Sequence, residues 1–243
     1  MVYRHLTDEE FTDLASRILY EDNHLLVVNK KVGEIVQGDK TSDEPLTETC
    51  KAFIAMRDSK PGQVFMGLPH RLDRPVSGIV VLAKTSKALE RLNAMFRDGN
   101  VTKVYWALVC QEPAQKEKLL EGMLWRNEKQ NKSYICRPGV LRKDAKLAKL
   151  KYCQIGKTDR YFLLEVELMT GRHHQIRCQL AKMGCPIKGD LKYGAPRSNP
   201  DGSISLHARN LTLEHPVSHE SISVTAPVPN DTLWQALSRG TAE

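Results

Sequence analysis

The sequence predicts an α+β fold in which many short strands form a mixed sheet and the helices lie in separate segments. The first observation is a series of short apolar runs with polar residues at both ends, each with the length of a strand. The second is the alternation over residues 160–169, where Leu164 and Val166 lie on one side and Glu165 and Glu167 on the other. With 243 residues, the chain is also long enough to bury a hydrophobic core.

The predicted strands follow one another along most of the chain. The run at 24–29 is apolar, and the run at 78–85 is rich in β-branched residues, as expected of buried strands. The predicted strands cover residues 24–29, 63–68, 78–85, 101–109, 125–135, 146–155, 160–169, 204–213 and 221–227.

Helices are predicted in three segments. The acidic opening segment indicates a surface helix. Residues 87–98 place their apolar side chains on one face, with Ser86 as the expected N-cap and Gly99 as the expected end. A further helix is predicted over residues 170–184, and it is expected to end at Gly184.

The chain shows no repeat, no low-complexity tract and no clear linker. Residues 1–243 are therefore expected to form a single domain. The strongly charged segment 112–160 is where two subdomains would meet, if the domain is divided.

The charge balance favours a polyanionic partner. Lys and Arg number 36 against 29 Asp and Glu, which gives a net charge of +7. Nucleic acid is the first expectation and an anionic membrane surface the second. There is no apolar run behind a basic start and none long enough to span a bilayer, so we expect a cytoplasmic protein. The six cysteines never form C-x-x-C, which argues against a zinc knuckle or a redox pair and favours buried thiols.

The stretch "PHRLDRPVSG", residues 69–78, holds one carboxylate, Asp73, between Arg71 and Arg74. In an arbitrary protein such a turn is usually a solvated cluster of ion pairs. The sequence contains neither of the glycine-rich phosphate-binding motifs, and it lacks the serine-nucleophile and zinc-protease motifs.

The adjacent His173 and His174 raise the question of a metal site. On a helix, neighbouring side chains point about 100° apart, and no third ligand follows at a useful spacing. One packed and one exposed imidazole are therefore expected, with no metal.

Six segments together resemble the RluA family of RNA pseudouridine synthases. Their order agrees with the family patterns H-R-L-D-x-x-T-S-G, K-x-Y, T-G-R-x-H-Q-I-R, G-x-P-h-x-G-D-x-x-Y-G and L-H-A, where h is apolar. The segments are "NKKVG" (29–33), "PHRLDRPVSG" (69–78), "KVYWAL" (103–108), "TGRHHQIR" (170–177), "GCPIKGDLKYG" (184–194) and "SLHARNL" (205–211).

The resemblance implies a largely antiparallel central sheet with flanking helices and a catalytic cleft. It also implies the short form of the enzyme, without an extra N-terminal RNA-binding domain. The reaction would isomerise uridine to pseudouridine in structured rRNA, tRNA or both, with no cofactor and no metal. RNA would be the partner, no membrane would be involved, and the chain would act as a monomer.

The resemblance assigns the catalytic roles to Asp73, Tyr105 and Arg177. Asp73 would attack C1′, add to C6 of the base, or remove a proton from C2′, and the residues do not choose among these routes. Arg177 would keep the carboxylate ionised in a closed pocket. Tyr105 would stack on the target base and handle the C5 proton, although a half-buried strand tyrosine is the plain alternative.

Six further residues are expected to bind the substrate. Lys30 and Arg172 would contact the RNA backbone, and Arg71 and Arg74 would face phosphates or neighbouring backbone. Base flipping is expected, with His70 or Arg74 filling the vacated place. The remaining residue, Leu206, would pack against the pocket.

The ordinary alternatives are solvated charges for the basic residues and a core position for the leucine. The basic residues of the segment 112–160 also have two readings: they either extend the surface that contacts RNA or only solvate one face of a sheet.

Three residues depart from the family pattern: Lys31 replaces a proline, Val76 a threonine, and His173 a small hydroxyl residue. A catalytically inactive RNA-binding protein on the same fold is the main alternative. A glycosidase or nucleosidase would need a second acid. Glu165 and Glu167 have the pattern of strand surface, and Asp190 lies in a turn motif.

Overall fold

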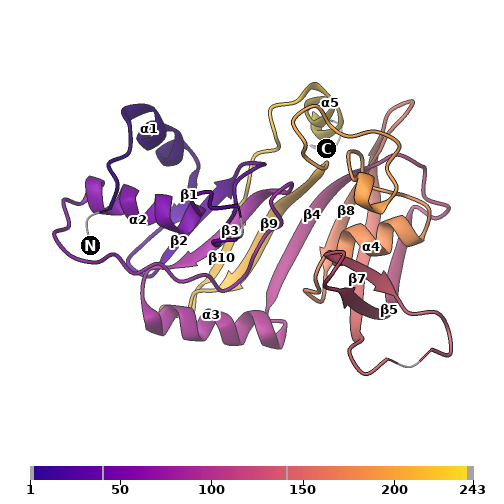
Figure 1. Cartoon of the computed structure of the whole chain (residues 1–243), viewed down its shortest axis with the longest axis horizontal. Coiled ribbons are helices and arrows are strands. Elements are labelled where there is room, and N and C mark those ends of the chain that lie inside the picture. The colour runs from indigo at the N-terminus through magenta and orange to yellow at the C-terminus, as the bar shows by residue number, and fades with distance from the viewer. Residues whose placement is uncertain (1–2, 40, 141, 240–243) are drawn as a thin grey trace. The chain divides into compact units, whose positions relative to one another are not determined.

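A computed structural model describes residues 3–39, 41–140 and 142–239 (Figure 1). The chain divides into two compact units, which are treated separately below. Unit 1 comprises Met1–Val101 and Asn210–Pro227, and unit 2 comprises Thr102–Arg209 and Val228–Glu243. The charged segment 112–160 lies within unit 2.

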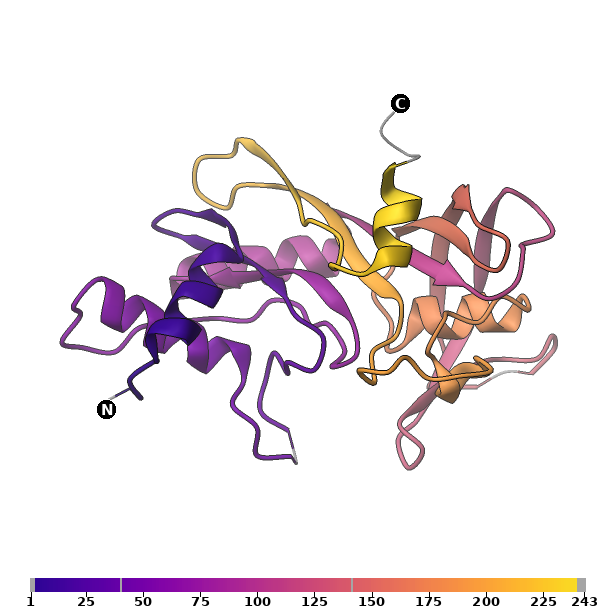
Figure 2. The same ribbon diagram turned by 90° about the horizontal axis from the view of Figure 1, so that it is seen from above.

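The sheet of unit 1 contains several antiparallel strand pairs. These strands are β1 (Ile18–Glu21), β2 (Leu25–Lys30), β3 (Ser77–Ala83), the second half of β9 (Leu206–Glu214) and β10 (Ser221–Thr225). The strand β2 pairs with β1 and β3, and β10 pairs with β9 in a hairpin that is gold in Figure 2. The strands predicted at 24–29, 78–85 and 221–227 are confirmed.

The strand predicted at 63–68 is wrong. Apart from one isolated bridge between Gly67 and Ala83, this run is irregular. The run approaches the helix that contains Leu89 so closely that a Cβ on Gly67 would lie 2.6 Å from the Leu89 side chain. Val64 and Met66 are buried while Phe65 is 43% exposed, so the run is partly buried without strand pairing.

The helices of unit 1 are α1 (Asp8–Ser16), α2 (Leu46–Arg57) and α3 (Ser86–Asp98). Every residue of β3 is buried, and Figure 1 shows α1 and α2 on one side of the strands and α3 on the other. The N-cap of α3 is Thr85, whose Oγ1 accepts from the Ala88 N–H at 3.2 Å, so the assignment to Ser86 was one residue late. The helix ends at Gly99 with φ +80°, as predicted.

Unit 2 is also built on antiparallel strands. They are β4 (Val101–Val109), β5 (Glu117–Asn127), β6 (Lys132–Ile135), β7 (Lys146–Lys157), β8 (Phe162–Leu168) and the first half of β9. Pairing runs in the order β4-β8-β7-β5-β6. The single strand predicted over 125–135 is in fact the two strands of a hairpin, because the chain turns at 128–131.

Helices cover both faces of the unit 2 sheet. The helix α5 (Thr232–Arg239) brings Trp234 against Trp106 and Leu163 on one face. The helix α4 (Gln175–Lys182) and the short helix η1 (Leu191–Tyr193) cover the other face, where Cys178 packs on Ala148. The α+β prediction is confirmed. Among the described residues, no helix has the length and apolar character needed to cross a membrane.

Candidate active site

Asp73 lies in the irregular segment that leads into β3 of unit 1. The backbone turns after Asp73, since the Val76 N–H donates to the Asp73 carbonyl oxygen at 3.0 Å. Asp73 is half-buried. The course of this segment depends on three neighbouring basic side chains, which are described next.

His70 anchors the Asp73 segment to β3 and α3. Its Nε2 accepts a hydrogen bond from the Val81 N–H at 2.9 Å. Its ring stacks on Phe96, with centroids 4.6 Å apart and planes inclined by 15°. This position gives His70 a structural role, and the substrate contact expected of it stays a prediction.

Lys30 is buried, and the prediction that it contacts the RNA backbone is wrong. It is only 1% exposed at the end of β2. Its Nζ donates to the carbonyl oxygens of Lys31 at 2.8 Å, Arg74 at 3.2 Å and Val76 at 2.6 Å. Two of these carbonyls belong to the Asp73 segment. Lys30 therefore fixes the backbone of the Asp73 segment through these hydrogen bonds.

The environment of Lys30 disfavours its charge. Burial lowers the pKa of Lys30 to about 8, although the negative charges of Glu34 and Asp73 act in the opposite direction. A buried amine is thus part of the electrostatic surroundings of the candidate catalytic carboxylate.

The two arginines that flank Asp73 differ in their surroundings. Arg74 donates from Nε to the Gly33 carbonyl at 3.0 Å, and the Gly33 N–H donates to the Arg74 carbonyl at 2.9 Å. The Arg74 guanidinium also pairs with Asp43. Arg71 is exposed and has no hydrogen bond or ion pair within the described ranges. Arg74 thus fits the expected contact with neighbouring backbone, whereas Arg71 is available to a ligand.

Arg177 on α4 of unit 2 forms a buried ion pair with Asp190. Its Nε lies 2.7 Å from Oδ2 of Asp190, and its Nη2 lies 2.8 Å from Oδ1. The two side chains are 7% and 1% exposed. This two-point contact fixes the plane of the guanidinium. The pairing of Arg177 with Asp73 stays a prediction, because the two residues belong to different units.

A tight turn holds Asp190 in place. The Asp190 N–H donates to the Ile187 carbonyl at 3.0 Å, and the Asp190 carbonyl accepts from the Tyr193 N–H at 3.0 Å. Gly189 has φ +88°, and a Cβ on it would lie 2.6 Å from the Ser203 carbonyl oxygen. Only glycine fits this position without a shift of the backbone.

Tyr193 connects the turn to Arg177, His174 and Ser133 within unit 2. Its ring centroid lies 5.1 Å from the guanidinium carbon of Arg177. Its Oη accepts from the Ser133 N–H at 2.8 Å and lies 3.1 Å from Nδ1 of His174. Burial raises the pKa of Tyr193, so the hydroxyl stays protonated. The hydrogen bonds and the ring contact hold α4, β6 and the turn together.

The histidine pair precedes α4 and does not lie within it. The helix begins at Gln175, and His174 has φ +51°. The rings of His173 and His174 stack with centroids 3.7 Å apart, so the expected divergence of about 100° is wrong. Burial and the charge of Arg177 lower the pKa of His174 to about 2, which keeps it neutral. Within the described ranges, no group of three His, Cys, Asp or Glu is suited to a metal ion.

Tyr105 faces the side of the unit 2 sheet that α4 covers. It is 8% exposed and lies opposite Val166, which in turn lies opposite Tyr152. Residues paired across strands share a face, as do residues two apart in one strand. Tyr105 therefore shares its face with Ala148, which packs on Cys178 of α4.

Lys103 shares this face because it precedes Tyr105 by two positions on β4. It is 9% exposed, burial lowers its pKa, and it has no hydrogen bond or ion pair in the described part of the chain. The sequence analysis did not include Lys103 among the candidate site residues, although it is the lysine of the K-x-Y motif. Leu206 is 4% exposed at the start of β9, and its pocket contact stays a prediction.

Arg172 is exposed at the surface of unit 2. Its Nε donates to the Leu147 carbonyl at 3.0 Å, and its backbone N–H donates to Oε1 of Gln175 at 3.0 Å. These contacts fix the base of the side chain at the start of α4. The backbone contact with RNA expected of Arg172 stays a prediction.

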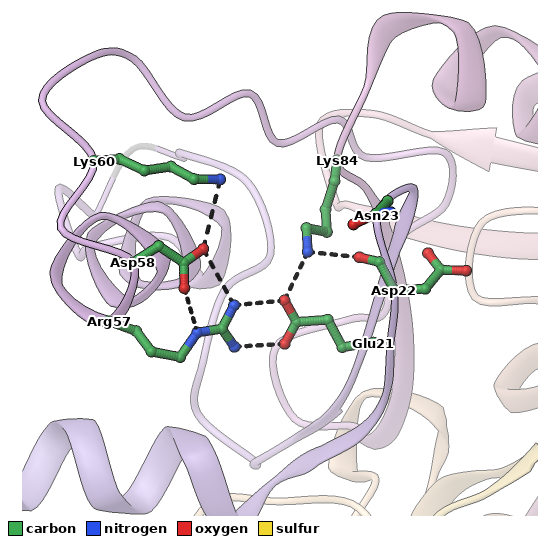
Figure 3. A pocket seen from close by; sticks show the side chains of 7 residues that line it. All are labelled: Glu21, Asp22, Asn23, Arg57, Asp58, Lys60 and Lys84. Atoms are coloured by element: carbon green, nitrogen blue, oxygen red, sulfur yellow. Dashed lines mark hydrogen bonds and ion pairs between the residues drawn. The ribbon is translucent and has the colours of Figure 1, made fainter.

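A pocket of about 410 Å³ in unit 1 is a separate feature (Figure 3). Its charged side chains pair with one another: Arg57 with Glu21 at 2.6 Å and with Asp58 at 2.8 Å, and Lys84 with Glu21 at 2.7 Å. Lys60 also pairs with Asp58, at 3.5 Å. None of the predicted site residues lines this pocket. The charges compensate one another, which is typical of a structural ion-pair network.

Comparisons with known proteins agree with the motif pattern. A family model described as "RNA pseudouridylate synthase" matches residues 24–182. The ribosomal large subunit pseudouridine synthase C of Vibrio vulnificus is 33% identical over 222 residues, which cover 89% of this chain and 67% of that protein. The ribosomal large subunit pseudouridine synthase D of Zymomonas mobilis is 30% identical, over 90% of this chain and 71% of that protein.

Solved structures show the same fold. The human RNA pseudouridylate synthase domain containing 4 superposes with a TM-score of 0.78 at 24% identity, over 95% of both chains. The human RNA pseudouridylate synthase domain containing 1 superposes with a TM-score of 0.70 at 23% identity, over 90% of this chain and 86% of that one. With both the motif order and these matches in agreement, the chain belongs to the RNA pseudouridylate synthase family, as an RluA-type RNA pseudouridine synthase and thus an isomerase.

Proposed function

We propose that this enzyme isomerises one or more uridines in ribosomal RNA, with Asp73 as the catalytic carboxylate and with tRNA as the second candidate substrate. Ribosomal RNA comes first because several relatives are named for the large ribosomal subunit. The proposal includes that the enzyme acts as a monomer in the cytoplasm, where ribosomal RNA is available.

The chemistry requires a carboxylate and a means to keep it ionised. The bond between C1′ and N1 of uridine must break, the uracil must turn, and C5 must then bond to C1′. Attack at C1′, addition at C6 and proton removal from C2′ remain the three routes open to Asp73. Arg177 would supply the opposing positive charge, and Asp190 would act as the positioning residue for Arg177. Tyr105 would stack on the uracil and handle its C5 proton.

A uridine within a folded RNA must leave its stack to reach a half-buried acid, so the proposal includes base flipping. His70 and Arg74 are already held by bonds to backbone groups, which weakens the case for either as the side chain that fills the vacated place. Arg71 is exposed two residues before Asp73. We assign the filling role to Arg71.

The observation that carries the proposal is that the family match at 24–182 includes Asp73, Tyr105 and Arg177. The contacts of Asp190 and Glu165 also argue against a glycosidase or nucleosidase, which would need a second catalytic acid. Asp190 is neutralised by Arg177, and Glu165 accepts a hydrogen bond from Nε1 of Trp106 at 3.1 Å. Neither acid is suited to act as the second catalytic group.

The test is a map of pseudouridine across all rRNA and tRNA in a host that lacks the gene. We expect one or a few rRNA sites to disappear and to return with the wild-type gene. The Asp73→Asn gene should not restore them. The Asp98→Asn gene should, because Asp98 is an exposed residue at the end of α3. Restoration by Asp73→Asn would refute the role of Asp73, and loss of tRNA sites alone would refute the rRNA assignment.

A further inference from the structure

The outer face of the β5–β6 hairpin in unit 2 carries two aromatic rings with cations against them. Trp125 and Tyr134 lie opposite each other across the two strands, with ring centroids 5.2 Å apart and planes inclined by 25°. The guanidinium carbon of Arg142 lies 3.8 Å from the Trp125 centroid. The Nζ of Lys132 lies 5.6 Å from the Tyr134 centroid. Both aromatic residues are half-buried, so part of each is open to solvent.

Apolar side chains extend this face onto β7. Met123 precedes Trp125 by two positions on β5, so it lies on the same face, and it is paired with Leu147 on β7. Met123 is 42% exposed and Leu147 is 39% exposed. The opposite face of the same strands carries Leu124, which packs in the core. The outer face is thus apolar and aromatic, yet uncovered in the described structure.

The charge of this region is strongly positive. Residues 125–151 contain nine basic and two acidic residues, a net charge of +7 that equals that of the whole chain. A polyanion is therefore the partner that the charge favours. The basic residues are Arg126, Lys129, Lys132, Arg137, Arg142, Lys143, Lys146, Lys149 and Lys151.

We propose that this face is a second RNA-binding surface, on which an unpaired base other than the target uridine stacks on the layer formed by Trp125 and Arg142. Flat aromatic rings within a basic surface are the usual platform for single-stranded nucleic acid. Arg142 is held in place for this role, since its Nε and Nη2 bond to Oδ1 and Oδ2 of Asp144 at 2.9 and 2.8 Å. The surrounding lysines would contact the phosphates. The inference rests on the proposed action on RNA.

Tryptophan fluorescence allows a direct test. The other two tryptophans, Trp106 and Trp234, are only 6% and 5% exposed, so Trp125 is the one open to a ligand. The probes are an eight-nucleotide oligoadenylate, which contains no uridine, and a blunt RNA duplex of twelve base pairs. We expect the oligoadenylate to quench the fluorescence of the wild-type protein. We also expect it to bind more tightly than the duplex.

The variants separate stacking from charge. Trp125→Leu should weaken oligoadenylate binding about 5- to 150-fold, the effect of losing one stacked base, and should remove the quenching. Arg142→Lys keeps the charge and loses the planar group, so its binding should be weaker than that of the wild type. Arg142→Gln should reduce the salt dependence, the slope of log K against log salt, by about 0.7. The matched control is Leu119→Ala, an exposed apolar residue on the same face of β5, which should bind like the wild type.

Other results would overturn the inference. If Trp125→Leu and Tyr134→Leu fold normally and bind oligoadenylate within twofold of the wild type, the rings do not bind RNA. If the duplex binds as tightly as the oligoadenylate, no unpaired base is recognised. If Trp125→Leu fails to fold, Arg142→Lys and Arg142→Gln provide the test, because Arg142 is exposed. Oligoadenylate affinity and salt slope that match the wild type in both variants would refute the inference. The assay involves no isomerisation, so its result is independent of whether Asp73→Asn abolishes activity.

Discussion

Replacing Lys30 with methionine tests the buried amine beneath the Asp73 segment. Methionine keeps most of the volume and apolar surface of the stem but removes three hydrogen bonds, two of them to the carbonyls of Arg74 and Val76. We expect kcat to fall about 10- to 100-fold with little change in KM, because a displaced carboxylate lowers the rate more than it weakens RNA binding.

The effect of pH on stability follows from the pKa of Lys30. Burial lowers it from 10.5 to about 8. Below pH 8 the lysine is protonated in both the folded and the unfolded chain, and the fold bears the full cost of the buried charge. Between pH 8 and 10.5 the unfolded chain binds more protons, so stability rises with pH. The difference of about 2.5 pH units, at about 1.4 kcal/mol for each, corresponds to about 3.5 kcal/mol at full titration, of which about 3 kcal/mol has developed at pH 10.5, where half of the unfolded chains still carry the proton.

Urea unfolding at pH 7 and at pH 10.5 measures this effect. Other groups titrate in the same range, so the relevant quantity is the free energy of unfolding of the wild type minus that of Lys30→Met. It should increase by about 3 kcal/mol between the two pH values. The same comparison with Lys87→Met, an exposed lysine of α3, should show no such increase. A difference for Lys30→Met that stays constant with pH would show that the amine is not desolvated.

Three further substitutions test other parts of the structure. Asp190→Asn should lower the free energy of unfolding by about 3 kcal/mol in urea, because it removes the negative charge from the buried ion pair with Arg177. Gly189→Ala should cost about 2 to 4 kcal/mol, since its Cβ would lie 2.6 Å from a carbonyl oxygen at φ +88°. Gly194→Ala, at φ +98° with open space around it, should cost only about 1 kcal/mol, and equal costs would contradict the steric argument. Arg71→Gln should leave the unfolding curve unchanged and lower kcat/KM on a hairpin RNA about tenfold, whereas unchanged kinetics would exclude a role in base flipping.

Local patterns were sufficient to predict several elements of the fold. The alternation over 160–169 predicted β8, because Leu164, Val166 and Leu168 are buried on one face and Glu167 is exposed on the other, although Leu163 is also buried on that second face against Trp234. The sequence also contained signals that were not used. Pro45, followed by apolar residues at Leu46, Cys50 and Phe53, marks the start and the buried face of α2.

Tertiary contacts explain the errors. The pattern of α4 continued back to 170, but the backbone of His174 is left-handed, in a buried site that no local pattern reveals. The turn at 128–131 contains neither glycine nor proline, and Asn131 supplies the positive φ of +45° instead.

The candidate site shows the same division. The motifs predicted roles for Asp73 and Arg177, because a motif depends only on the order of residues along the chain. They did not show that Lys30 is enclosed by carbonyls of a segment more than forty positions later, or that Asp190 holds the guanidinium. An ordinary surface frequency for lysine favoured solvent exposure, and only the folded backbone reverses that expectation.

The chain passes from one unit to the other at residues 101, 209 and 227, so neither unit is a continuous piece of the sequence. During synthesis, β1, β2 and β3 emerge more than a hundred residues before β9 and β10, which complete the sheet of unit 1. The growing chain therefore carries an unfinished sheet while unit 2 is made. Domain-by-domain folding on the ribosome is not available to this enzyme, and a nascent chain halted before residue 210 would still lack those last two strands of unit 1.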